Sequence, residues 1–317
     1  MVLSVGKNNS GIPYPKVPDD RKALVGRCAK KNTPQETALI QRHLREGLSE
    51  QVIGQFRQMV YGYYREHCRV LPWREHATSW QVLVSEVMLQ QTQVERVIPK
   101  YPAFLGQFPD PASLVAAPLP ELLAAWQGLG YNRRALALQR AARMLVEQYD
   151  GQVPDDPEQL RQLPGIGSYT AGAIAAFAFN QPTVFLETNI RAVLLHLFCA
   201  DRQQVADKEL LLIAERTLDR QQPGQWYNAL MDYGSDLKRR FPNPSRRSRQ
   251  HSVQSRFEGS DRQVRGAVLR LLLKETSMQE TVLCEQLAVE SGRLQRILAE
   301  LVQEGFIVRK GGRCRIC

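Results

Sequence analysis

The sequence predicts an all-α domain followed by a small α+β domain. From Thr78 to Tyr233 apolar residues recur at helical spacing, and the helical stretches are separated only by short breaks such as FPDP, LGY and LPGIG. No stretch in this region alternates between apolar and polar residues as a half-buried strand does. After a basic, proline-containing stretch, three helical segments precede two short strands joined by Gly311 and Gly312.

The domain boundaries follow from changes in composition along the 317 residues. Residues 1–32 are polar and basic and are predicted to form a flexible tail. Thr33 and Pro34 begin the first helix, Gly47 ends it, and Ser49 begins a second helix that reaches about His67. We predict a helical domain over 33–236, a basic linker or loop over 237–260, and a winged-helix-like domain over 261–317.

The charge of the chain favours a polyanionic partner. Lysine and arginine number 42 against 32 acids, a formal net charge of +10, which is typical of nucleic-acid binding and also of simple solubility. No apolar run has membrane-spanning length, and the first residues lack the apolar core of a secretory leader. We therefore expect a cytoplasmic protein without a membrane partner.

The six cysteines are scattered, as expected of a reduced intracellular chain. Cys314 and Cys317 have the spacing of half a zinc or redox site, but the sequence contains no second pair. We expect no metal site there. The stretch from Leu237 to Phe257 contains seven basic residues and no acid. Such a block is either a solvated linker or a phosphate-binding surface, and we expect Arg239, Arg240, Arg246 and Arg247 to contact DNA.

A glutamate stands inside an apolar helical stretch, SWQVLVSEVMLQQTQV. On a helix, Glu86 shares a face with Val82, Leu83 and Leu89. An ionised carboxylate is rarely buried on such a face without a partner. Either a distant group satisfies Glu86, or it has a chemical role.

The stretch LPGIGSYTAGA predicts a tight hairpin between two helices. Gly165 and Gly167 permit positive φ angles and let backbone N–H groups approach a ligand closely. The helix that begins at Ser168 would direct its unpaired N–H groups, together with those of Ile166, towards a phosphate. Such a contact positions a protein on the nucleic-acid backbone without reading base identity.

These motifs resemble those of a known superfamily. LPGIGSYTAGA is similar to the helix-hairpin-helix of the DNA glycosylases that include endonuclease III. PWREHATSWQVLVSEVMLQQTQV, LLAAWQGLGYNRRALALQRAA and MDYGSD resemble the adenine DNA glycosylase (MutY) family, in unbroken order from about Phe56 to Asp236. The resemblance implies a fold of two helical lobes and a partner that is double-stranded DNA containing a lesion or mismatch.

The resemblance assigns catalytic roles to four residues. Glu86 is the acid that protonates the leaving base, and an apolar pocket would keep its proton available near neutral pH. Glu187 occupies the place of a second carboxylate that the family usually supplies as aspartate, and Asn189 would orient it or the attacking water. Tyr169 stands where bifunctional relatives have a Schiff-base lysine, which predicts a monofunctional enzyme without strand cleavage. A helix-capping role is the alternative for Glu187.

The resemblance also implies DNA-binding residues. Gln90 and Gln91 would contact the opposite base or enter the stack. Leu129, Gly130 and Tyr131 would wedge beside a nucleotide that is flipped out of the duplex. Backbone carbonyls of Leu163 and Ile166 would be the ligands of a possible monovalent cation.

Two parts of the sequence depart from the family pattern. The segment after MDYGSD has none of the four cysteines that hold the family's iron–sulfur cluster, so we predict that no cluster is bound. The usual C-terminal domain is replaced by the winged-helix-like segment, which is either a second DNA-binding module or a docking or dimerisation domain.

Three functions follow from these observations. The first is a monofunctional glycosylase of the MutY type, with an adenine mispair as first substrate. The second is a glycosylase of the same fold that removes mispaired thymine or uracil, or a modified purine. The third is a catalytically silent protein that binds DNA structures.

Overall fold

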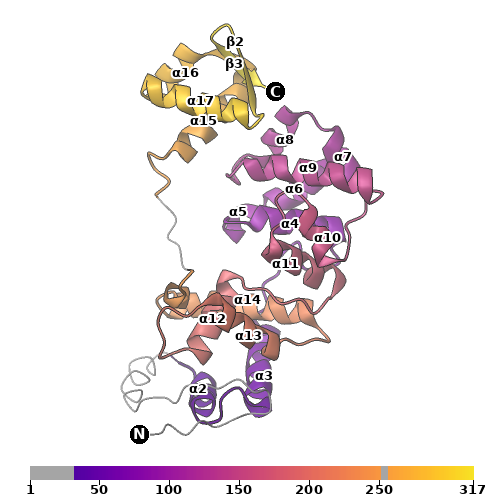
Figure 1. The fold of residues 1–317 in the computed structure, drawn as a ribbon, viewed down its shortest axis with the longest axis vertical. Helices are drawn as coiled ribbons and strands as arrows, with labels where there is room; N and C mark the ends of the chain where they lie inside the picture. Colours follow the sequence, from indigo (N-terminus) through magenta and orange to yellow (C-terminus); the bar gives the residue numbers. More distant parts are fainter. Residues whose placement is uncertain (1–31, 251–255) are drawn as a thin grey trace. The chain divides into compact units, whose positions relative to one another are not determined.

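The computed structural model describes residues 32–250 and 256–317 (Figure 1). All but Asn32 of the predicted tail, and residues 251–255 of the predicted linker, lie outside this part. The elements in chain order are α2 (Pro34–Glu46), α3 (Glu50–His67), α4 (Ser79–Leu89), α5 (Val94–Val97), α6 (Lys100–Gln107), α7 (Pro111–Ala116), α8 (Leu119–Trp126), α9 (Arg133–Gln148), α10 (Pro157–Gln162), α11 (Ser168–Phe179), α12 (Thr188–Phe198), α13 (Asp207–Thr217), α14 (Pro223–Arg240), the 3-10 helix η1 (Pro244–Arg247), α15 (Asp261–Glu275), β1 (Ser277–Gln279), α16 (Glu280–Leu287), α17 (Ser291–Gln303), β2 (Ile307–Lys310) and β3 (Arg313–Ile316).

The described residues form two compact units that are not continuous in sequence. The first unit consists of 32–68, 186–217 and 228–250. The second unit consists of 69–185, 218–227 and 256–317, and the boundary falls within α14. The region 33–236, predicted as all-α, contains only helices among its described residues, apart from an isolated bridge from Val205 to Ser248.

The first unit packs α2 and α3 beside α12 and α13. Thr33 begins α2 with a reciprocal capping box to Glu36, as the Thr-Pro-x-Glu spacing predicts. Phe56 of α3 meets Phe198 of α12 edge-on, with ring centroids 5.0 Å apart. Gly234 lets α14 pack closely against the start of α12. A Cβ at position 234 would lie only 2.3 Å from the Asn189 carbonyl oxygen.

Residues 237–250, which the sequence analysis assigns to a basic linker or loop, are folded within the first unit. The first four residues, from Leu237 to Arg240, extend α14 by one turn. The 3-10 helix that follows packs on α12, and the Ser245 hydroxyl donates to the Thr188 carbonyl at 2.9 Å. Arg247 of the same segment donates to the carbonyls of Leu195, Cys199 and Ala200, at the end of α12 where helix carbonyls lack intrahelical partners.

The second unit is built around a large apolar core formed by α4, α6, α8, α9, α10 and α11. Small residues on α11, including Ala171 and Ala175, are fully buried and let this helix pack closely against α4. Trp126 is fully buried in this core, and its indole nitrogen donates to the Gly130 carbonyl at 3.1 Å. The core therefore holds the ends of α4 and α8, where the predicted site residues lie.

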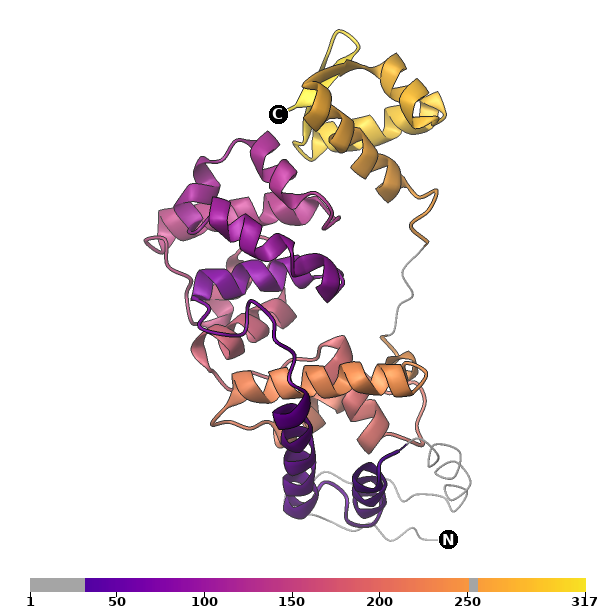
Figure 2. The same cartoon turned by 180° about the vertical axis from the view of Figure 1, so that it is seen from behind.

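The C-terminal part of the second unit, drawn in orange to yellow in Figure 2, combines α15, α16 and α17 with a small antiparallel sheet. The strand order in this sheet is β1-β3-β2. The sequence predicts a two-stranded hairpin, and the structure adds Ser277–Gln279 as a third strand. Met278 of this strand pairs with Cys314, and both are buried in the apolar cluster of this part. Three residues are too few to show the alternating pattern of a strand, so the sequence does not reveal β1. The strand is defined by its pairing with β3.

Along the described residues, every helix is too short or too polar to cross a lipid bilayer.

Candidate active site

Glu86 lies on α4 and is buried, with 6% of its surface exposed. A capping box between Thr78 and Gln81 starts the helix, as its spacing predicts. Seven other residues of α4 are also buried, so the helix is fixed on nearly every side. Burying a carboxyl group costs free energy, which makes Glu86 a candidate functional residue.

The predicted hairpin connects α10 to α11. Gly165 has a φ of +82°, and a Cβ at this position would lie 2.8 Å from the Ala137 Cβ. Leu163 and Ile166 are buried and anchor the turn, whereas Gly165, Gly167 and Ser168 are exposed. Gly167 caps α11 without a side-chain hydrogen bond, which leaves the first N–H groups of the helix to an external acceptor.

Gln90 joins the end of α4 to this hairpin. Its amide nitrogen donates to the Gly165 carbonyl at 3.1 Å and to the Thr170 hydroxyl at 3.2 Å. Gln91 is exposed and adopts a φ of +54°, a conformation that is uncommon for residues other than glycine. Gln90 therefore has an intramolecular role, while the side chain of Gln91 is presented to solvent.

Arg134, which the sequence analysis did not single out, is the centre of this region. Its Nη1 donates to the carbonyls of Val87 and Met88, both at 2.8 Å. Its Nη2 donates to the Leu129 and Gly130 carbonyls at 3.1 Å each, and to the Thr92 hydroxyl. Burial lowers the pKa of Arg134 to about 10, which leaves it charged at neutral pH. One guanidinium thus ties the helix that bears Glu86 to the predicted wedge loop.

The sequence does contain a pattern that points to Arg134. It shares the buried face of α9 with Leu138, Ala142 and Leu145, at helical spacing. A charged residue on such a stripe needs partners, for the reason that draws attention to Glu86. The three residues of the wedge loop differ in setting, since Leu129 is buried whereas Gly130 and Tyr131 are exposed.

Tyr169 lies in the first turn of α11 and is half-buried. Its ring meets that of Phe185 edge-on, with centroids 5.6 Å apart. Phe185 also stacks on Tyr227, which donates from its hydroxyl to the Thr183 carbonyl at 2.8 Å. Aromatic contacts of the second unit therefore hold Tyr169 in place.

Glu187 and Asn189 belong to the first unit, at the start of α12. Glu187 is the N-cap of this helix, and its carboxylate accepts the backbone N–H of Asn189. The capping alternative is thus realised in the geometry, and it leaves the second carboxylate oxygen for another role. Lys238 of α14 interacts electrostatically with Glu187; burial lowers the pKa of Lys238, and the Glu187 charge opposes this effect.

The four arginines predicted to contact DNA fall into two groups. Arg240 pairs with Glu36 and Asp236, and Arg247 donates to the carbonyls of Leu195, Cys199 and Ala200 at the end of α12. Arg239 and Arg246 are exposed, although Arg239 also lies 3.4 Å from the Asp236 carboxylate. The structure thus gives Arg240 and Arg247 roles within the chain, and phosphate contact by Arg239 and Arg246 stays a prediction.

An iron–sulfur cluster of four thiolates does not fit the segment 237–250. The sequence has no cysteine between Cys199 and Cys284. Cys199 is buried, and burial raises the pKa of its thiol to about 11, which disfavours the thiolate that a metal requires. For the predicted cation, the Leu163 carbonyl accepts the Ile166 N–H at 3.1 Å, and cation binding there stays a prediction.

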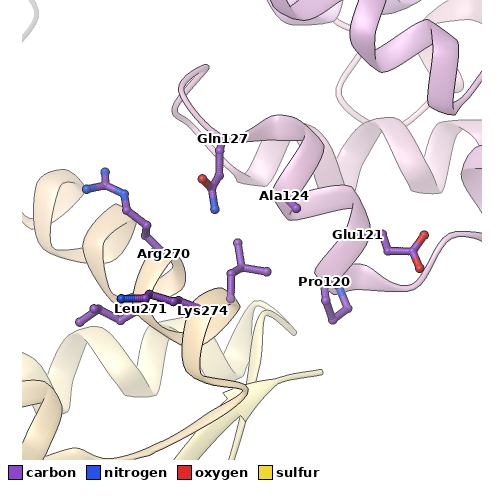
Figure 3. Close-up of a pocket in the computed structure, with 8 residues that line it drawn as sticks. Pro120, Glu121, Ala124, Gln127, Arg270, Leu271 and Lys274 are labelled. Carbon is purple, nitrogen blue, oxygen red and sulfur yellow. The ribbon is translucent and has the colours of Figure 1, made fainter.

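A separate pocket lies between α8 and α15 of the second unit (Figure 3). Its lining residues are Pro120, Glu121, Ala124, Gln127, Arg270, Leu271, Leu273 and Lys274. None of the predicted catalytic residues lines it, so its position does not bear on the candidate chemistry.

Comparisons with known proteins bear on the family. The model of the HhH-GPD superfamily of base excision DNA repair proteins matches residues 84–216. An adenine DNA glycosylase of Mycolicibacterium smegmatis is 36% identical over 235 residues, which cover 69% of this chain and 80% of the relative. The human adenine DNA glycosylase is 38% identical over 194 residues, which cover 57% of this chain and 36% of the relative.

A further relative and a solved structure agree with this family. An adenine DNA glycosylase of Mycobacterium tuberculosis is 46% identical over 132 residues, so that the match, like the human one, spans less than half of the relative's length (43%). A solved structure of a thermostable thymine-DNA glycosylase superposes with a TM-score of 0.52 at 23% identity, over 58% of this chain and 86% of that chain, which shows a shared fold. The chain therefore belongs to the adenine DNA glycosylase family of the helix-hairpin-helix superfamily of base excision DNA repair proteins.

Proposed function

We propose that this chain is a monofunctional DNA glycosylase that hydrolyses the N-glycosidic bond of a mispaired or damaged base. The observation that supports it is the buried Glu86 on α4, the helix whose end is tied to the hairpin by Gln90 and to the wedge loop by Arg134. An acid, a phosphate-binding turn and a wedge loop are the parts that flipping and excision require. The names of the relatives make an adenine mispair the first substrate to test.

The proposed reaction uses two carboxyl groups in different states. Glu86 transfers its proton to the leaving base as the bond from C1′ to the base nitrogen breaks, and the bonding electrons leave with the base. The Glu187 carboxylate stabilises the positive charge that develops on the sugar. Water then adds to C1′, and the proton that it releases returns to Glu86. The products are a free base and an abasic site.

We further propose that the strand is left intact. A Schiff base with the sugar requires an amine at the place where Tyr169 stands, and a phenol does not supply one.

The chain is also proposed to act without an iron–sulfur cluster. Support comes from Arg247, whose three hydrogen bonds to carbonyls in and just after the last turn of α12 brace the segment by other means. Exposed Arg239 and Arg246 would then contact phosphates directly.

For the C-terminal part we propose a winged-helix module that contacts DNA through its hairpin. The order of three helices and a small sheet supports this topology. On α17, Arg293 and Arg296 form ion pairs with Asp261. A DNA-recognition helix would instead use such side chains to contact DNA. On the β2–β3 hairpin Lys310, Arg313 and Arg315 are exposed, although Arg313 also donates to the Ser277 hydroxyl and carbonyl at 3.2 Å.

The test is a panel of duplexes, each with one lesion or mismatch, scored for abasic sites and for strand breaks. We expect abasic sites in at least one duplex and no breaks. Glu86→Gln should slow release by about 10²–10⁴-fold while DNA affinity is kept, since only the proton donor is lost. Glu95→Gln, an exposed carboxylate of the same unit, is the matched control.

The outcomes separate the candidate functions. Release of thymine, uracil or a modified purine instead of adenine would support the second candidate. The presence of Glu187 in place of the family's usual aspartate is the feature that favours the third candidate, a protein that binds DNA structures without catalysis. Tight binding to branched or mismatched DNA with no release from any duplex would overturn the enzymatic proposal in favour of a structure-binding protein.

A further inference from the structure

The C-terminal part packs directly on the helices that precede the wedge loop. Leu123 of α8 belongs to the same buried apolar cluster as Val268 and Leu272 of α15. Leu119 and Leu136 pack against the edge of this cluster. Burial of apolar side chains from both sides joins α15 to α8 and α9 within the second unit.

Ion pairs strengthen this junction. Arg133, two residues after Tyr131, forms a bidentate pair with Glu304, with distances of 2.8 and 2.5 Å. Arg265 of α15 pairs with the same carboxylate and, at 2.9 Å, with Glu300. Burial alone would raise the pKa of Glu304, but the two guanidinium groups lower it, so the carboxylate stays charged. The start of α9 is therefore fixed to α15 and α17.

Arg262 of α15 reaches the wedge loop itself. Its Nη1 donates to the Tyr131 hydroxyl at 2.6 Å, and its guanidinium carbon lies 5.6 Å from the Tyr131 ring centroid. Arg134 lies at the same distance from this ring. Tyr131 itself has a φ of +48° and is 36% exposed. An exposed tyrosine in this conformation needs partners to hold one orientation, and two cationic groups provide them.

We propose that Arg262 is a positioning residue, through which the C-terminal domain holds Tyr131 in the orientation that enters the DNA stack. The inference rests on the proposed function, because Tyr131 is assigned to DNA only there. It gives the C-terminal domain a role in base flipping in addition to any phosphate contact of its own. Without Arg262 the ring would sample several orientations, and each binding event would have to order it again.

The first experiment measures the loop in the full-length protein without DNA. Hydrogen exchange of the backbone amides of residues 127–134 should be about three- to tenfold faster in Arg262→Gln than in the unchanged chain, because a charge-assisted hydrogen bond and a cation–π contact are lost. Arg262→Lys, which keeps the charge and a donor, should restore most of the protection. Arg270→Gln, an exposed arginine of the same helix, should leave exchange unchanged.

The second experiment measures excision on the duplex that the panel selects. Arg262→Gln should raise KM by about five- to tenfold with kcat changed less than twofold, because ordering is lost before chemistry and not during it. Tyr131→Phe removes the acceptor, so Arg262→Gln should have a much smaller additional effect in that background.

The two proposals fail in different ways. If no duplex releases a base, the proposed function is wrong, and the exchange experiment still tests the contact. If excision occurs but exchange and KM are the same in Arg262→Gln and in Arg270→Gln, the positioning role is wrong while the glycosylase stands. An equal loss of melting temperature in Arg262→Gln and Arg262→Lys, with no KM change, would assign Arg262 to folding alone.

Discussion

Glu187 is the N-cap of α12 and, in the proposed reaction, the second carboxylate. Its carboxylate caps α12 by accepting the Asn189 N–H. We predict that Glu187→Asp keeps the fold, because aspartate is also a preferred N-cap, and raises the single-turnover rate of excision severalfold. The reason is that a shorter side chain is the one the family usually places there. A rate more than tenfold lower in this variant would show that the site is built around glutamate.

Arg134 stabilises the second unit through the number of hydrogen bonds that its one side chain donates. It donates to four backbone carbonyls, those of Val87, Met88, Leu129 and Gly130. We predict that Arg134→Lys lowers the free energy of unfolding by about 2–4 kcal/mol, since an ammonium group cannot reach all of them and several charge-assisted hydrogen bonds are lost. Urea denaturation measures this loss, and Arg140→Lys, an exposed change on the same helix, should cost almost nothing.

Among the elements, α2 and α12 each carry a buried titratable side chain that makes the stability of the fold depend on pH. His196 of α12 is buried, and burial lowers its pKa to about 4. Burial would raise the pKa of Glu36 on α2, but hydrogen bonds from Arg240 and Tyr233 outweigh it and hold the pKa low. For His196 the unfolded chain binds the extra proton first, so stability is full above about pH 6.5 and falls towards pH 4. Glu36 adds a loss in the same direction, but only below its ordinary pKa.

We predict that the free energy of unfolding falls by roughly 1–2 kcal/mol between pH 7 and pH 5 through His196. His196→Phe, which keeps an aromatic ring beside Phe241, should remove much of this dependence. Urea unfolding curves at the two pH values test it. If the unfolding curve shifts between the two pH values as much in the variant as in the unchanged chain, other groups cause the acid sensitivity. His43 is then the first candidate, because burial lowers its pKa as well.

The whole molecule has a net charge of +10, which makes the salt dependence of DNA binding the natural measurement. Replacing exposed Arg239 and Arg246 by glutamine should weaken binding to any duplex and reduce the slope of log K against log salt by about 2, because two phosphate contacts are lost. The double change Arg140→Gln and Arg143→Gln, which removes the same charge from α9, is the control. Equal slopes in the two variants would return Arg239 and Arg246 to a solvated surface.

Most of the fold follows from local features of the sequence. Helical periodicity, the capping boxes at Thr33 and Thr78, and the glycine turn at Gly165 predict the helices and their breaks, because these depend on neighbours a few residues apart. Glu86 stands out for a similar reason, since a carboxylate on an apolar helical face is visible in the sequence itself. The order of the motifs was enough to indicate the family.

The tertiary structure decided what depends on residues far apart in the chain. Strand β1 exists because β3, some 36 residues later, pairs with it. Arginines that look alike in sequence are divided into those that satisfy carboxylates or carbonyls, such as Arg240 and Arg247, and those left to solvent, such as Arg246. The contact of Arg262 with Tyr131 spans 131 residues. Local patterns determine which segments are helical, but only packing determines which charges find partners, because a partner is set by distance in space.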